Sequence, residues 1–179
     1  MAHPDENRRT VDDATPAGTL VPSRTRWGAA ALAGLVAGAV ALVLEMLLLG
    51  FVYGISFWSP LHANAVIVMG PGALPAASPT TGTIVIVGAA IQLALSALYG
   101  LLIGWLVHRM DLGPALLVGL AVGVALYALQ FYLIAPAMLP WFVGLRTWVM
   151  AIGFMVFGLL TAGLYIGMRG RRVPRARVG

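Results

Sequence analysis

The chain has 179 residues, of which 60% are hydrophobic and only 9% are charged, and its mean hydropathy is +0.93. A soluble domain carries about 25% charged residues, so this composition excludes an ordinary soluble globular protein and favours a protein dissolved in lipid. The net charge of +5 does not indicate a nucleic-acid partner, because all eleven basic residues are arginines and nearly all of them lie next to apolar segments.

The first segment, residues 1–26, is polar and interrupted by prolines. Because nothing in it could bury a core, we expect a disordered cytoplasmic tail. The next segment, 27–55, is almost wholly apolar, and at about 1.5 Å per residue it is long enough to cross a hydrocarbon layer of about 30 Å. The triplet Ala37-Gly38-Ala39 looks like a signal-peptide cleavage site, but the apolar run continues well past it, which indicates a spanning anchor.

Three further segments are long and apolar enough to span, at 83–107, 114–135 and 147–168. Pro114 opens one of them, in the first turn, where a helix needs no amide hydrogen. The sequence therefore predicts an all-α membrane protein. Its four transmembrane helices form one domain over 27–168, followed by an arginine-rich tail over 169–179.

The arginines predict the orientation. Arg109 lies in the 108–113 link, and Arg146 is alone in the two other connections. Five more arginines follow the last span: Arg169, Arg171, Arg172, Arg175 and Arg177. The positive-inside rule then places both termini and the 108–113 link in the cytoplasm, with 56–82 and 136–146 outside. We expect the arginine-rich face to contact anionic lipid headgroups.

The longer outer connection, 56–82, has an apolar middle over 63–69 that is too short to span. Three positions are open to this connection: on the interface, re-entering the bundle, or covering its outer mouth. Trp58 and Trp141 suit the headgroup level, where aromatic side chains gather.

The chain also contains an approximate internal repeat. A shift of 85 residues lays Gly34 and Gly38 on Gly119 and Gly123, and it lays Glu45 on Gln130. Two other pairs of segments match: Pro71-Gly72-Ala73-Leu74-Pro75 with Pro136-Ala137-Met138-Leu139-Pro140, and Leu98-Tyr99-Gly100-Leu101-Leu102 with Val156-Phe157-Gly158-Leu159-Leu160. The matches predict a tandem repeat of a two-helix hairpin, with both copies in the same orientation. Chance matching in a chain rich in Gly, Ala and Leu is the alternative.

Small residues recur along one face of each span, often four positions apart. They are Gly34, Gly38, Gly88, Ser96, Gly100, Gly104, Gly119, Gly123 and Gly158. In lipid, helices associate where such residues let their backbones approach closely, so this set predicts helix packing within the bundle. A second interpretation is that one of these stripes faces another subunit.

Four polar residues form a candidate layer near the outer ends of the spans: Glu45, Gln92, Gln130 and Arg146. Glu45 is the only acid within a span. An ionised carboxylate there costs at least about 2.5 kcal/mol, so it should face inward, be paired, or be protonated. Gln92 and Gln130 could donate hydrogen bonds to it, and Arg146 could reach towards it. The layer is either a structural clamp or a functional site.

No catalytic residue, metal site or cofactor is predicted. The chain has no cysteine, and it contains no nucleophile elbow, zinc-protease histidine pair, phosphate loop or dinucleotide glycine signature. His62 and His108 should lie on opposite sides of the membrane, which argues against a shared metal or haem.

The sequence resembles a group of small uncharacterised bacterial inner-membrane proteins, some of them labelled "sodium:proline symporter", and it is distantly similar to YagU-type proteins. The likeness covers nearly all of 27–168 and is carried by Gly70-Pro71-Gly72-Ala73-Leu74-Pro75, Tyr99-Gly100-Leu101, Phe131-Tyr132, Pro140-Trp141-Phe142, Arg146-Thr147-Trp148-Val149 and Val156-Phe157-Gly158. It implies a multi-pass protein of the bacterial inner membrane. Members often have a histidine where this chain has Phe154. Sodium-coupled proline carriers need many more spans than four, so the label would carry over only if several copies assemble.

Three functions follow as hypotheses. The lack of catalytic motifs makes a scaffold or accessory subunit of a membrane complex, without enzymatic activity of its own, the function that the sequence predicts, and the other two are alternatives. Glu45 and the repeat favour an oligomeric permease or channel-like protein with a solute or proton site. A lipid-phase enzyme using Glu45 and Arg146 is the third. A homo-oligomer or a larger membrane complex is expected in the first two cases.

Overall fold

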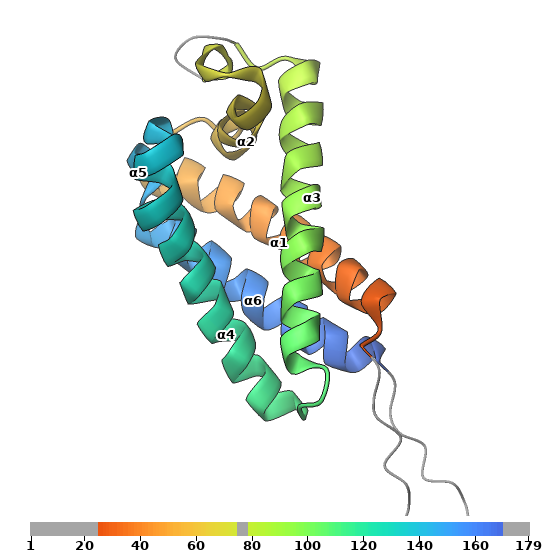
Figure 1. The fold of residues 1–179 in the computed structure, drawn as a ribbon. Coiled ribbons are helices and arrows are strands. Elements are labelled where there is room, and N and C mark those ends of the chain that lie inside the picture. The colour runs from red at the N-terminus through yellow and green to blue at the C-terminus, as the bar shows by residue number, and fades with distance from the viewer. Residues whose placement is uncertain (1–24, 75–78, 170–179) are drawn as a thin grey trace, which may run out of the picture.

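The computed structural model describes residues 25–74 and 79–169, and within them it contains helices and no strand (Figure 1). In chain order the elements are α1 (Trp27–Tyr53), α2 (Ser59–Met69), η1 (Pro71–Ala73), α3 (Gly82–Val107), α4 (Leu112–Ala128), η2 (Leu129–Ile134), α5 (Ala135–Met138), η3 (Pro140–Leu145) and α6 (Trp148–Met168). The all-α class is confirmed. The predicted tails over 1–26 and 169–179 fall almost entirely outside the described residues.

Four helical stretches in the described part of the chain are long and apolar enough to cross a membrane: Trp27–Tyr53, Gly82–Val107, Leu112–Ala137 and Trp148–Met168. These are the four predicted spans, with ends that differ by a few residues. Local residues explain the ends. Gly54 adopts the left-handed conformation (φ 63°) that stops α1, and the hydroxyls of Thr81 and Thr147 accept backbone N–H bonds that start α3 and α6.

The two ends of the described chain contact each other, and the C-terminal end contacts the α3–α4 link. The Arg26 guanidinium donates to the carbonyls of Met168 and Arg169 at 3.2 and 3.1 Å, and Arg169 donates to the carbonyls of His108 and Met110. We call this the arginine end of the bundle. The opposite end, where α2 lies, is called the α2 end (Figure 1).

The spans are paired as two hairpins, α1 with α3 and α4 with α6, and the contact of α1 with α6 joins them. Within each hairpin the backbones touch at glycines. A Cβ added to Gly100 would lie 2.6 Å from the Cα of Gly34, and one added to Gly158 would lie 2.9 Å from the carbonyl carbon of Gly119. Neither position therefore has room for any side chain.

These contacts agree with the predicted repeat. In the first hairpin Gly34 meets Gly100 and Gly38 meets Ser96. The shift of 85 residues takes Gly34 and Gly38 to Gly119 and Gly123. The shift that matches 98–102 with 156–160 takes Gly100 and Ser96 to Gly158 and Phe154. In the second hairpin Gly119 meets Gly158 and Gly123 meets Phe154. The proline segments agree less well, because 71–73 forms the 3-10 turn η1, whereas 136–138 belongs to α5.

The remaining small residues are also covered from within the chain. Gly88 lies against the backbone of Leu61 on α2, and Gly104 lies between Ala30 of α1 and Tyr165 of α6. All nine predicted small residues therefore lie at contacts between helices of this chain, and none of them is left to face a second subunit.

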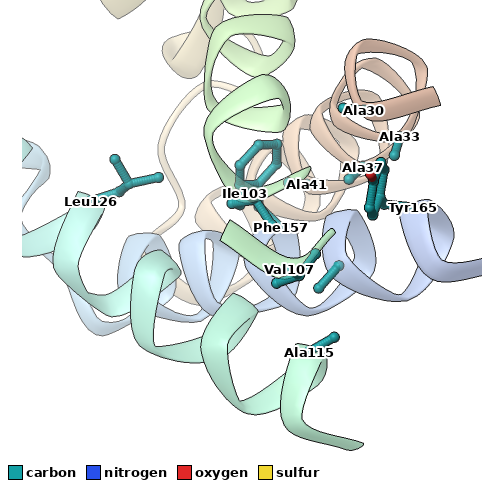
Figure 2. Close-up of a cluster of buried hydrophobic side chains, with 11 residues drawn as sticks. Ala30, Ala33, Ala37, Ala41, Ile103, Val107, Ala115, Leu126, Phe157 and Tyr165 are labelled. Carbon is teal, nitrogen blue, oxygen red and sulfur yellow. The ribbon is translucent and has the colours of Figure 1, made fainter. Parts of the chain in front are cut away.

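The largest buried cluster fills the arginine half of the bundle. Figure 2 shows four alanines of α1 beside Tyr165 and Phe157 of α6, with Ile103 and Val107 of α3 completing the cluster. Small side chains on α1 make room for the aromatic rings of α6, so the helices cross closely without leaving a void.

The connection between α1 and α3 packs against the bundle at its α2 end. The first eight residues of α2, Ser59 to Val66, are all buried, mainly against α3. His62 is fully buried and bonded on both nitrogens, to the carbonyl of Ala73 at 2.7 Å and to the hydroxyl of Thr80 at 2.8 Å. Since a carbonyl only accepts, Nδ1 carries the proton. His62 therefore ties the chain after α2 onto the bundle.

The glycine contacts predict a large effect of side-chain size at Gly100. Gly100→Leu should lower the free energy of unfolding by at least about 1–3 kcal/mol, because the surrounding atoms are backbone atoms that cannot move aside. The equivalent change Gly158→Leu should act alike. The control is Leu98→Phe, at a position on α3 that is 59% exposed. Thermal unfolding in mild detergent gives the comparison, and equal midpoints for all three variants would contradict the packing role.

Candidate functional site

A cavity lies between the two hairpins, beneath α2. Side chains from α1, α2, α3, η2, η3 and α6 line it, and the volume open to the centre of a water molecule is about 50 Å³. A water molecule needs at least about 10–15 Å³ by this measure, so the cavity has room for about three to four waters or a small organic molecule. It is thus a space inside the membrane-spanning bundle that side chains leave unfilled.

Glu45 supplies the acidic group of this cavity. Its side chain is only 6% exposed, and its carboxyl group lies against Gly153 of α6, where any side chain would collide with it. Among the described residues Glu45 has no hydrogen-bond partner and no ion-pair partner. A buried carboxyl without a partner is costly. It is therefore the feature of the site that most needs an explanation.

Gln92 and Gln130 line the same cavity as Glu45, as the predicted polar layer requires. The predicted clamp is nevertheless absent. The side-chain oxygen of Gln92 accepts a hydrogen bond from the side-chain amide of Asn64 on α2, at 2.8 Å. Neither glutamine bonds to Glu45. The polar contact that closes the α2 end is thus an amide–amide bond between α2 and α3.

Arg146 does not belong to the cavity lining. Its side chain is exposed, and its guanidinium carbon lies 4.8 Å from the ring centroid of Tyr132. This cation–π contact holds the charge away from Glu45. Of the four predicted polar residues, the structure therefore brings three together and leaves Arg146 outside.

Residues of both hairpins line the cavity. Residues at equivalent positions of the two hairpins line it in pairs: Glu45 with Gln130, Gln92 with Met150, Leu95 with Gly153, Ser96 with Phe154, and Tyr99 with Phe157. The rings of Tyr99 and Phe157 meet edge to face, 6.4 Å apart. In four of these pairs the more polar residue comes from the first hairpin, so that hairpin supplies most of the polar groups of the lining.

Gln130 is positioned by a break in helical geometry. It lies in η2, a π-helical stretch between α4 and α5, where the N–H of Ala135 bonds to the carbonyl of Gln130, five residues back. Pro136 follows directly and has no N–H to continue the regular ladder. Such π-turns re-aim side chains and are frequent at functional sites. The sequence prediction treated this span as regular and missed the break, although Pro136 was its visible signal.

Two further polar residues of the lining were also missed. Asn64 was not singled out because it lies in a segment of uncertain position, although an amide inside the apolar stretch 63–69 was a usable signal. Tyr99 was noted only as part of the repeat. The histidines fall where they were predicted, with His62 at the α2 end and His108 at the arginine end, and neither lines the cavity.

The unpartnered carboxyl predicts the stability of Glu45→Gln. This substitution keeps the size of the side chain and removes an ionisable group that is costly in lipid. The free energy of unfolding should therefore stay within about 1 kcal/mol of the original or rise. Thermal unfolding in detergent measures it, with Val43→Leu on the exposed face of α1 as the control. A clear loss of stability in Glu45→Gln alone would mean that the carboxyl has a structural partner after all.

No family model matches this chain, and no curated protein or solved structure matches it either. The resemblance to small bacterial inner-membrane proteins therefore stays a prediction. The arguments that follow rest on the cavity and its residues alone.

Proposed function

We propose that the protein is a permease or channel-like membrane protein that binds a cation, or a proton, at Glu45. One observation carries the proposal: a buried carboxyl without a partner opens into a cavity between two repeated hairpins. A structural acid would be expected to have found a hydrogen-bond donor, since donors from Gln92, Gln130 and Asn64 are all at the cavity.

The place of the cavity supports the same function. Glu45 lies eight residues before Tyr53, the last residue of α1, which is about 12 Å into the membrane-spanning part. Solute sites of secondary transporters lie between repeats and within the bilayer, often beside broken helices. The cavity between the hairpins, with Gln130 on the π-helical stretch, has both features.

The two other hypotheses have less support. A scaffold needs no unfilled polar cavity, and nothing else in the described residues favours a scaffold over a permease. A lipid-phase enzyme was based on Glu45 acting with Arg146, but Arg146 lies over Tyr132 and outside the cavity. Both hypotheses stay predictions, and the cavity supports neither of them.

The proposal includes a location. We place the protein in the inner membrane of a bacterium, with both termini and the 108–113 link in the cytoplasm and the α2 end outside. The arginine distribution supports this orientation. It would bring Arg26, Arg109 and Arg169 to anionic headgroups on the cytoplasmic side. Assembly as a homo-oligomer or within a larger complex is part of the proposal.

Reporter fusions test the orientation. Fusions at positions 75 and 140 should report an external location, and fusions at 111 and 175 a cytoplasmic one, because the arginines cluster at one end only. An alkaline phosphatase and a fluorescent-protein reporter at each position give opposite readouts and so control for expression. A cytoplasmic readout at position 75 would contradict the orientation.

Cation permeation tests the function. Liposomes containing the purified protein should pass protons, sodium or small organic cations faster than empty liposomes under an imposed membrane potential. Glu45→Gln should reduce this flux at least tenfold, since an amide carries no charge to replace the hydration of a cation. The control, Val43→Leu, should retain the flux. Equal flux through Glu45→Gln and the original protein would refute the role of Glu45.

A further inference from the structure

We infer that the solute bound at Glu45 is a small primary alkylammonium ion, with about four carbons, rather than a bare metal ion. This inference rests on the proposed function and names its substrate class. It follows from three properties of the cavity: its acidic residue, the apolar character of much of its lining, and its size.

The acidic residue of the cavity selects a cation. Glu45 is the only acidic or basic side chain among the lining residues, and the four arginines of the described chain all lie elsewhere. The neighbouring polar groups also suit an ammonium head. An ammonium group has three N–H donors. The carboxyl group of Glu45, the hydroxyl of Ser96 and the side-chain oxygen of Gln130 offer oxygen acceptors at the same cavity.

Much of the rest of the cavity lining is apolar. Met150, Phe154 and Phe157 of α6 belong to it, together with Leu49 and Leu145. A metal ion or a hydrated cation would leave these apolar side chains in contact with water or with charge. An alkyl chain would instead contact them, and the aromatic faces would also favour a nearby ammonium.

The size of the cavity limits the solute. A volume of about 50 Å³ open to water centres corresponds to about three to four water molecules. A butylammonium ion has one nitrogen and four carbons, so it is close to this size. Peptides, sugars and nucleotides are too large for the cavity as the structure has it.

The cavity also has a side from which an amphipathic cation could enter. Gln92, Leu95 and Tyr99 of α3 and Gln130 of η2 line the cavity and yet remain half-exposed. Figure 1 shows that α3 and α4 diverge from their link. An ion with an alkyl tail partitions into the bilayer more readily than a bare cation does, which suits entry from this side.

Direct binding tests the inference. Radiolabelled n-butylammonium, which is protonated at pH 7, should bind saturably to the full chain in detergent or nanodiscs, as measured by equilibrium dialysis. Unlabelled n-butanol has the same tail without the charge, and butyrate has the opposite charge. Neither should compete at concentrations at which n-butylammonium does.

Two variants locate the binding site. Glu45→Gln should weaken n-butylammonium binding at least tenfold. Gly153→Ala should weaken it severalfold without changing any charge, because the added methyl group pushes the Glu45 carboxyl into the cavity. Val43→Leu should bind as the original protein does. Thermal unfolding of each variant shows that it is folded.

The outcomes separate the two proposals. If sodium binds or permeates in a Glu45-dependent way and n-butylammonium does not bind, the substrate class is wrong and the proposed function stands. If n-butanol competes as well as n-butylammonium, the cavity binds apolar molecules without regard to charge, and the inference is refuted. If no cation binds or permeates in a Glu45-dependent way, both proposals fail.

Discussion

The bundle depends on backbone-to-backbone contact at glycines. Gly34 against Gly100, and Gly119 against Gly158, bring each pair of helices closer than any side chain would allow. In lipid no hydrophobic effect drives helices together, so close van der Waals packing of this kind has to do so. The contacts are confined to lines of small residues, and they fix the crossing point and the rotation of each helix. Every position that points into the cavity follows from that rotation.

The two hairpins share their packing residues and differ in their lining residues. The pair Gly34–Gly100 has an equivalent pair of glycines in the second hairpin, and so the two hairpins pack alike. Around the cavity the equivalent residues have diverged, with Tyr99 facing Phe157 and Gln92 opposed by Met150. The glycine contacts of the two hairpins therefore agree with the predicted repeat, and the lining residues are where the two hairpins differ.

Much of the fold could be predicted from the sequence, because length, hydropathy and small-residue spacing are local properties. The four spans, the small-residue contacts and the pairing within hairpins all follow from them. The site was only partly predictable. The sequence predicted how far Glu45, Gln92 and Gln130 lie along their helices. It did not predict the rotation of each helix about its axis, which decides which side chains meet. Gln92 bonds to Asn64, on a segment whose position depends on the tertiary contacts of His62. The side chain of Arg146 lies over the ring of Tyr132. The spacing of residues in the sequence does not predict this contact.

The strongest sign that the cavity is more than a packing defect is the residue against which the Glu45 carboxyl lies, Gly153. The carboxyl needs the empty space at Gly153, and the residue equivalent to Gly153 in the first hairpin is Leu95. Gly153 is not required for the contact of α4 with α6, which is made through Gly119, Gly123 and Gly158. A leucine at 153 would fill the cavity and would exclude the acid. The chain instead combines an acid on α1 with a glycine opposite it on α6, where packing alone would favour two apolar side chains. This combination leaves an ionisable group beside a cavity inside the bundle.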